Sequence, residues 1–175
     1  MTKKLYFIAI FPPQQIIDEV QIFKRDLALH YENSKALKNE AHITLCPPFS
    51  READWEEDIF RAFYDIDTHI APFEIVLNGF GSFANPKNPV IYIQPEDSEP
   101  LRILYQRVKA KFNFNNYSFN PHMTVAYRDL TWENYLKAWE VYNEKPYKTN
   151  FLVDKIILLR HDQQWVPIAE KKLIL

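Results

Sequence analysis

Two short motifs of the same form carry residue types that can perform acid–base chemistry. Each reads His-x-Thr followed by an apolar residue; one begins at His42 and the other at His122, about 80 residues later. On a β-strand, residues i and i+2 face the same side, so each histidine shares a face with its threonine, Thr44 or Thr124. An imidazole gives or takes a proton near neutral pH, because its unperturbed pKa is about 6.5. The motifs therefore predict two proton-transfer groups, each beside a hydroxyl.

If the two motif strands are related by a pseudo-two-fold axis, both imidazoles and both hydroxyls converge on one cleft. Opening a phosphodiester needs a base for the attacking oxygen and an acid for the leaving oxygen on the opposite side of phosphorus. The hydroxyls can hold the non-bridging oxygens and stabilise the charge that develops there. The pattern thus indicates His42 and His122 as catalytic residues, and Thr44 and Thr124 as phosphate-binding residues.

A structural role and a metal site are the alternatives for these residues. One strand histidine beside a threonine is commonly structural, but two such pairs at equivalent places favour chemistry. Two histidines can also be two zinc ligands, and Cys46, four residues after His42, could face the same cleft. Zinc usually takes a third protein ligand, however, and no carboxylate lies at a typical ligand spacing from either motif histidine. We therefore predict neither a metal nor a cofactor. The remaining histidines have no such partner and are expected at helix ends or on the surface: His30, His69 and His161.

The composition indicates one globular unit without a general electrostatic attraction for polyanions. The chain has 175 residues, of which 47% are apolar, with 21 basic against 23 acidic side chains. This length suits one domain or two small lobes that share a core. A formal net charge of −2 disfavours binding to long duplexes through their phosphates. An RNA end or a small nucleotide stays open as a ligand, and we expect a monomer.

Cysteine usage and hydropathy indicate the compartment. The single cysteine, Cys46, excludes a disulfide framework and fits a reducing environment. No stretch approaches the roughly 20 apolar residues of a membrane span. The apolar run at 5–11 follows two lysines, as in a signal peptide, but Pro12 and Pro13 end it and no small-residue cleavage site follows. We expect a cytoplasmic protein without a membrane partner.

Glycine is scarce, and its scarcity excludes whole classes of function. The chain contains only Gly79 and Gly81. A P-loop and a dinucleotide-binding loop both need several glycines where the backbone approaches phosphate. A nucleophile elbow of the GxSxG type is also missing from the sequence. ATP-dependent phosphoryl transfer and nicotinamide redox chemistry are therefore disfavoured.

Hydrophobic periodicity predicts alternating strands and helices in the first half. We expect a strand at 5–11 and a helix from about 14 to 28. A short strand at 42–46 would end at the two prolines that follow it. Ser50 would then cap a helix, and a strand would cover 73–80. The inward face of that helix is expected to hold Trp55, Ile59, Phe63 and Ile66.

The second half repeats this order of elements. We expect a strand at 90–93, a helix over 101–112, a strand at 122–127 after an Asn-rich loop, and a strand at 151–159. Before the last strand, Thr131 should start a helix with Trp132, Leu136 and Trp139 inward. A terminal hairpin would pair 165–169 with 172–175. Two copies of strand–helix–strand–helix–strand, at roughly 5–80 and 90–160, suggest a duplication within a single bilobal domain at 1–175.

The paired motifs resemble the signature of the 2H phosphoesterase superfamily. The resemblance is closest to its LigT-like branch, the 2′-5′ RNA ligase or RNA 2′,3′-cyclic phosphodiesterase family. An opening apolar strand followed by prolines, the segment 80–83 before the strand at 90–93, and Pro121 directly before His122 are similar to that family as well. The resemblance covers about residues 5–130.

The resemblance implies both an architecture and an activity. The architecture is α+β: two pseudo-symmetric lobes with mostly antiparallel sheets and outer helices around a central cleft. The activity is metal-independent hydrolysis of 2′,3′-cyclic phosphates at RNA ends or on nucleotides, by acid–base catalysis from His42 and His122. A 2′-phosphate product would make His122 the base and His42 the acid, but the residues alone leave that assignment open.

Departures from the family pattern point to further substrate contacts. Many relatives place an arginine five residues after the second histidine; here Tyr127 occupies that position and Arg128 follows. We therefore treat both as candidate substrate contacts. Other aromatic residues could contact a base or sugar, although aromatics are common enough here that each is more often a core residue: Phe11, Phe49 and Tyr92.

Two other functions use the same residues. The same step run backwards is an ATP-independent 2′-5′ RNA ligase, which equilibrium and the concentration of water disfavour. A non-catalytic module would bind RNA ends or nucleotides without turning them over. Turnover of a cyclic nucleotide in EDTA separates an enzyme from such a module.

Overall fold

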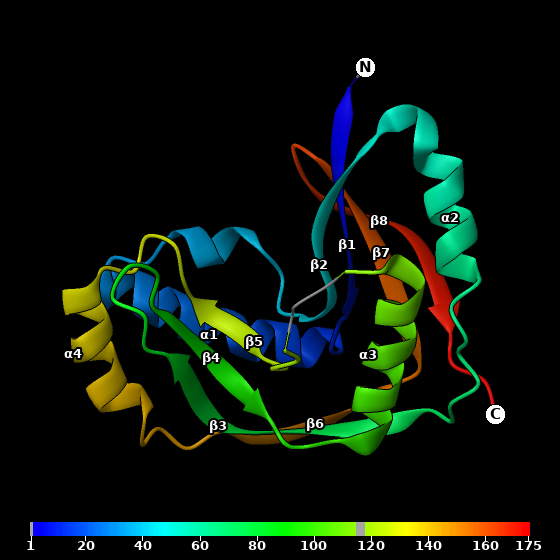
Figure 1. The fold of residues 1–175 in the computed structure, drawn as a ribbon. Coiled ribbons are helices and arrows are strands. Elements are labelled where there is room, and N and C mark those ends of the chain that lie inside the picture. The colour runs from blue at the N-terminus through cyan, green and yellow to red at the C-terminus, as the bar shows by residue number, and fades with distance from the viewer. Residues whose placement is uncertain (1, 115–117) are drawn as a thin grey trace.

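The chain forms two four-stranded antiparallel sheets with helices around them (Figure 1). The structure is a computed structural model that describes residues 2–114 and 118–175. One sheet has the strand order β2-β1-β7-β8 and the other β5-β4-β3-β6. The elements are β1 (Lys3–Ile10), α1 (Gln14–Tyr31), η1 (Lys35–Lys38), β2 (Ile43–Glu52), η2 (Ala53–Trp55), α2 (Glu56–Tyr64), β3 (Phe73–Phe83), β4 (Val90–Pro95), α3 (Glu99–Phe112), β5 (Met123–Ala126), α4 (Trp132–Tyr142), β6 (Lys148–Val153), β7 (Lys155–Asp162) and β8 (Gln164–Lys172). The predicted α+β class with two antiparallel sheets is confirmed.

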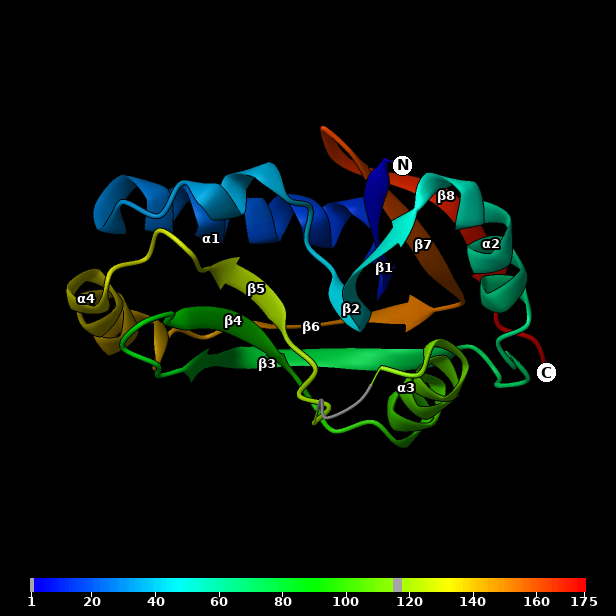
Figure 2. The same ribbon diagram turned by 45° about the horizontal axis from the view of Figure 1, so that its top comes forward.

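The two lobes share one core because each sends a helix to the other. Helix α1, which follows β1 of the first sheet, packs against β5 and α4. Helix α3, which follows β4 of the second sheet, packs against β2 and α2. Figure 2 shows α1 running alongside the second sheet and α3 beside the first. One continuous apolar cluster therefore includes residues of both sheets, such as Ile8 and Ile43 with Ile75 and Ile93.

The sheets do not follow the boundary between the two predicted repeats. Strand β3 belongs to the first repeat by sequence but lies in the second sheet, whereas β7 and β8 complete the first sheet. Each motif strand nevertheless has the same place, at the edge of its sheet and antiparallel to the strand that opens its repeat. The duplication of 5–80 and 90–160 stays a prediction drawn from the order of elements.

Strand β2 is longer than the sequence predicts. It continues through Pro47 and Pro48 to Glu52, with Ser50 opposite Leu5 of β1. An edge strand tolerates proline because its outward N–H groups have no partner in the sheet. The predicted cap at Ser50 is therefore wrong, and α2 begins only at Glu56.

The strands predicted for the C-terminal part from hydrophobic periodicity are also wrong in their boundaries. The apolar run at 151–159 is two strands in different sheets, because the chain turns at the exposed Asp154 between β6 and β7. The terminal hairpin is β7 with β8, and Gln163 at its turn adopts a φ of 64°. A run of uniform hydrophobicity does not reveal where the chain changes sheets.

Helix faces were partly predicted. Thr131 caps α4 as expected, since its hydroxyl accepts a hydrogen bond from the Asn134 N–H. Trp55 and Leu136 were expected to face inward but are 57% and 47% exposed. The buried face of α4 consists instead of Tyr135, Ala138 and Tyr142. In the part of the chain that the structure describes, no helix is long and apolar enough to cross a membrane.

Candidate active site

Both motif strands contain an irregularity at the same position. In β2 the pairing with β1 passes over Leu45, the residue after Thr44; in β5 the pairing with β4 passes over Val125, the residue after Thr124. Both extra residues are fully buried. Bulges of this kind re-aim neighbouring side chains and are frequent next to active sites. The two motifs therefore share a backbone conformation as well as a sequence pattern.

The two histidines are anchored in the same way. The Nδ1 atom of His42 lies 2.7 Å from the Glu40 carbonyl oxygen, and that of His122 lies 2.7 Å from the Asn120 carbonyl oxygen. A carbonyl can only accept, so each ring donates its Nδ1–H. The hydrogen bond fixes the ring orientation and leaves Nε2 without a proton in the neutral ring. Each Nε2 is thus prepared to receive a proton, or to give one once the ring is charged.

His42 lies in apolar surroundings that disfavour its charged form. Its ring centroid is 5.2 Å from that of Phe7 and 5.6 Å from that of Phe11. Burial is the main cause that lowers the pKa of His42 to about 4, and the charges of Lys24 and His122 lower it further. The hydrogen bond to the Glu40 carbonyl acts in the opposite direction. His42 is therefore neutral at pH 7 in the free protein.

His122 has a different set of neighbours. Its ring centroid is 5.1 Å from that of Phe83, edge to face, and 5.4 Å from that of Tyr92. Burial lowers the pKa of His122, and the hydrogen bond to the Asn120 carbonyl opposes that shift. Because the charge of His122 also lowers the pKa of His42, the two imidazoles are electrostatically coupled. Thr44 and Thr124 are half-buried on the same strand faces.

Lys24 is a buried lysine next to the first motif. It is 2% exposed on the inner face of α1, and its Nζ donates a hydrogen bond of 2.5 Å to the Asn39 carbonyl. Burial lowers its pKa to about 8, with the charge of Glu40 opposing. Lysine is almost never fully buried unless it is paired. The hydrogen bond of Lys24 therefore connects α1 to Asn39. The next residue in the chain, Glu40, provides the carbonyl that orients His42.

Gly81 makes room for Tyr92 in the second half of the site. It lies directly opposite Tyr92 in the β3–β4 pair. A Cβ atom at Gly81 would lie 2.5 Å from a ring carbon of Tyr92, closer than such atoms approach. The ring of Tyr92 therefore crosses β3 at the position of Gly81, beside His122.

Comparison with known proteins decides the family. The family model of the 2′-5′ RNA ligase superfamily matches residues 12–165. The chain belongs to this superfamily. A Bacillus thuringiensis (strain Al Hakam) protein named "Putative phosphoesterase" is 32% identical over 121 residues, which cover 68% of this chain and 67% of that protein. The resemblance found in the two motifs is thus confirmed at the level of a LigT-like phosphoesterase.

Solved structures of this superfamily show the same fold. The apo crystal structure of Escherichia coli LigT matches with a TM-score of 0.74 at 17% identity, covering 100% of both chains. The structure of the same protein complexed with 3′-AMP matches with a TM-score of 0.75 at 16% identity, covering 99% of this chain and 100% of that one. The arrangement of two antiparallel sheets is therefore common to both proteins.

The residues that the sequence predicts as substrate contacts do not all lie beside the two histidines. Phe11 lies beside His42, and Tyr92 lies beside His122. Tyr127 receives a hydrogen bond of 2.5 Å at its hydroxyl from the side-chain amide of Asn39. Arg128 is exposed, and its guanidinium carbon lies 5.0 Å from the centroid of the Tyr127 ring. Tyr127 thus joins the segment before the first motif to the end of β5, and its contact with substrate stays a prediction.

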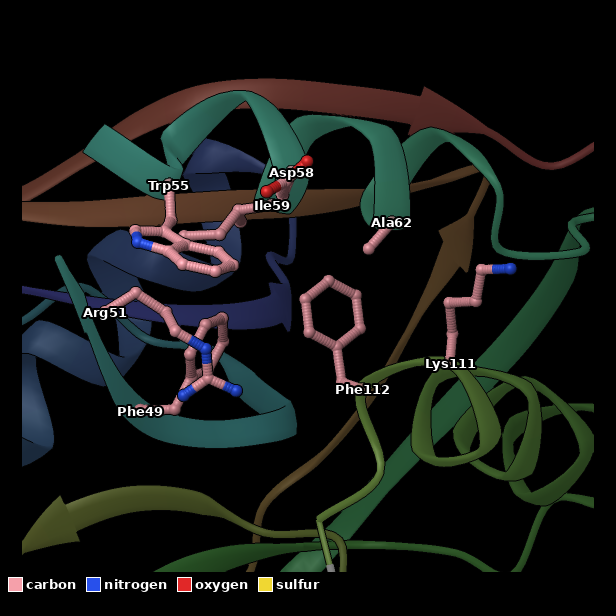
Figure 3. A pocket seen from close by; sticks show the side chains of 8 residues that line it. All are labelled: Phe49, Arg51, Trp55, Asp58, Ile59, Ala62, Lys111 and Phe112. Carbon is pink, nitrogen blue, oxygen red and sulfur yellow. The ribbon is translucent and has the colours of Figure 1, made fainter. Parts of the chain in front are cut away.

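Phe49 lies on the other face of the first sheet. Its ring stacks on Tyr6 at 5.8 Å and contacts Phe112 at 5.5 Å, and Arg51 lies 5.3 Å from its centroid. It lines a hollow between β2, α2 and α3 (Figure 3) that neither motif histidine lines. The further lining residues are Trp55, Asp58, Ile59, Ala62 and Lys111.

The third zinc ligand considered for the first motif faces the core. Cys46 is 1% exposed and belongs to the main apolar cluster. The bulge at Leu45 reverses the alternation of side chains, so an even offset from His42 does not return to the face that carries His42. Among residues 2–114 and 118–175, no three His, Cys, Asp or Glu side chains gather where they could hold a metal ion.

Proposed function

We propose that this phosphoesterase is a metal-independent cyclic phosphodiesterase that hydrolyses 2′,3′-cyclic phosphates at RNA ends or on nucleotides. The observation that carries the proposal is the matched pair of histidines, each with Nδ1 anchored to a backbone carbonyl and Nε2 left for proton transfer. E. coli LigT, which shares the fold, has been crystallised with 3′-AMP and with ATP. A nucleotide-sized ligand is therefore compatible with this architecture.

Hydrolysis requires two proton transfers around one phosphorus atom. A neutral imidazole takes a proton from water, whose oxygen forms a new bond to phosphorus. The bond from phosphorus to one ribose oxygen breaks, and a protonated imidazole gives its proton to that oxygen. The Thr44 and Thr124 hydroxyls donate hydrogen bonds to the non-bridging oxygens and stabilise their charge.

The surroundings of the two histidines favour one assignment of these roles. Burial lowers the pKa of both histidines, and the charges of Lys24 and His122 lower that of His42 further, so we assign His42 as the base and His122 as the acid. The family resemblance implies the reverse, with a 2′-phosphate as product. In the same pose of the substrate, exchange of the two roles would leave the phosphate on the 3′ oxygen. A 2′-phosphate product therefore counts against the assignment made here.

Turnover of 2′,3′-cyclic AMP in EDTA tests the proposal. We expect hydrolysis to continue in the chelator, and His122→Ala to lose it while the fold, followed by circular dichroism, is kept. His30→Ala is the matched control, because His30 is an exposed histidine on α1 paired with Asp26, and it should keep full activity. Binding without turnover would make the chain a non-catalytic module. Activity lost in EDTA and restored by zinc would contradict the metal-independent mechanism.

A further inference from the structure

A row of aromatic rings runs from the first catalytic histidine across the first sheet. The centroid of Phe7 is 5.2 Å from that of His42 and 4.5 Å from that of Trp165. Trp165 in turn lies 5.0 Å from His161. We call His42, Phe7, Trp165 and His161 the aromatic row. Phe7, His161 and Trp165 come from β1, β7 and β8, and His42 directly precedes β2, so the row crosses the first sheet.

Strand register places the aromatic row on the face of the sheet that carries His42. Phe7 lies opposite Leu159, and Trp165 lies opposite His161. Because directly opposite residues share a face, these side chains are on the side that carries His42. Phe7 and Leu159 form a small apolar cluster, with Trp165 packed against it, that is separate from the main core. His42 and Trp165 are therefore connected through the buried Phe7 ring on one face of the sheet.

Neither aromatic neighbour of Trp165 stacks in parallel on its indole ring. The indole meets Phe7 at an interplanar angle of 77° and His161 at 78°. Trp165 is only partly buried and His161 is exposed. Aromatic rings presented in this way bind the bases of single-stranded nucleic acids, and they do so for any base because every base has a π-face.

We propose that Trp165 stacks the nucleobase that precedes the nucleotide carrying the cyclic phosphate. The proposal rests on the proposed function and deepens it: the site would select RNA ends of two or more nucleotides over cyclic mononucleotides. The charge of the chain fits this reading. With a formal net charge of −2, the protein has little overall electrostatic attraction for an RNA backbone, and stacking on Trp165 would supply the added binding.

Paired substrates test the proposal. We would measure kcat/KM for 2′,3′-cyclic AMP and for the dinucleotide ApA ending in a 2′,3′-cyclic phosphate. The wild type should prefer the dinucleotide. Trp165→Ala should lower kcat/KM for the dinucleotide by about 5- to 150-fold, the range for loss of one stacked base, and leave the mononucleotide unchanged. Trp165→Phe should keep most of the preference.

Two further variants make the test specific. Trp165→Leu keeps an apolar contact with Phe7 but removes the stacking surface. It should lower kcat/KM for the dinucleotide and leave that for the mononucleotide unchanged, and it replaces Trp165→Ala in the test if the alanine variant does not fold. Trp55→Ala is the matched control, because Trp55 is a 57% exposed tryptophan that lines the hollow on the opposite face of the sheet (Figure 3). It should leave both substrates unaffected.

The outcomes separate this inference from the proposed function. If the wild type hydrolyses neither substrate, the proposed function fails and the inference falls with it. If it hydrolyses both equally well and the Trp165 variants change nothing, only the inference is overturned. If Trp165→Leu lowers kcat/KM equally for both substrates, Trp165 supports Phe7 and His42 structurally, and the inference is again overturned.

Discussion

The two halves of the site share a backbone but differ in their surroundings. Each histidine precedes the same bulge and donates its Nδ1–H to the carbonyl two residues earlier at 2.7 Å. His42, however, lies beside two phenylalanines and near the buried Lys24, whereas His122 lies beside Phe83 and Tyr92. In the proposed mechanism, the repeated motif sets the geometry of proton transfer, and the neighbours that are not repeated set its direction.

Different surroundings can assign opposite roles to two histidines that have the same anchoring. Pairs of titratable groups whose environments separate their pKa values are the pattern of acid–base sites. Here burial and a nearby cation lower the pKa of His42 to about 4, while that of His122 is lowered by burial.

Loss of either histidine should have the largest effect. His42→Ala and His122→Ala each remove a proton-transfer partner and should lower kcat/KM for a cyclic nucleotide by about 10²–10⁴-fold. Because both act in one step, the double variant should lose less than the product of the two single losses. Steady-state kinetics on purified variants, with thermal unfolding as a check on the fold, measures this. Unchanged turnover in either single variant would mean that its motif is structural.

A change at Gly81 should affect only the His122 half. Gly81→Ala places a methyl group 2.5 Å from the Tyr92 ring, which must move away from its place beside His122. We expect kcat/KM to fall by about 10-fold to 100-fold, as is typical when positioning near the reacting atoms is lost. The matched variant is Gly79→Ala, since an added Cβ there meets nothing within 4 Å, although its φ of 70° costs stability. Equal losses of activity in both variants would attribute the effect to folding.

Removal of Lys24 should shift the pH profile of the His42 half. In the wild type, the plot of kcat/KM against pH should be bell-shaped, with its maximum below pH 7. The acidic limb reflects the pKa of the base, about 4, and the basic limb reflects the lowered pKa of the acid. Lys24→Met removes a cation that disfavours protonated His42, so the acidic limb should move to higher pH, by up to about one unit. Burial remains the larger cause, so the limb should stay below pH 6.5. Movement of the acidic limb to lower pH would contradict this reading.

The sequence singles out the proposed catalytic pair because its signal is local. Residue type, the two-residue spacing and the repeat are all visible in His42, Thr44, His122 and Thr124. Lys24 was missed although it carried a signal: it falls at the helical spacing of the buried residues of α1, where a lysine is unusual. Gly81 entered the sequence analysis through the scarcity of glycine and the resemblance of segment 80–83, but the space it leaves for Tyr92 could not be predicted, since it depends on a ring from the neighbouring strand.

Other features depend on pairing between distant segments. Cys46 faces the core because of a bulge that no local pattern indicates. The passage of β2 through two prolines depends on its place at the edge of the sheet. The contact of Phe7 with Trp165 connects β1 and β8, the first and last strands of the chain. It therefore follows only from the strand order of the sheet. Sequence patterns describe elements, but contacts between remote elements arise from topology.

The division of roles between the histidines is tested most directly by changing the leaving group. An aryl phosphodiester of a nucleoside expels a phenolate that needs no protonation, so it should not need the acid. We predict that His122→Ala recovers most of its lost kcat/KM on the aryl substrate relative to a 2′,3′-cyclic nucleotide, whereas His42→Ala does not. Recovery in His42→Ala instead would make His42 the acid and would contradict the assignment drawn from its buried surroundings.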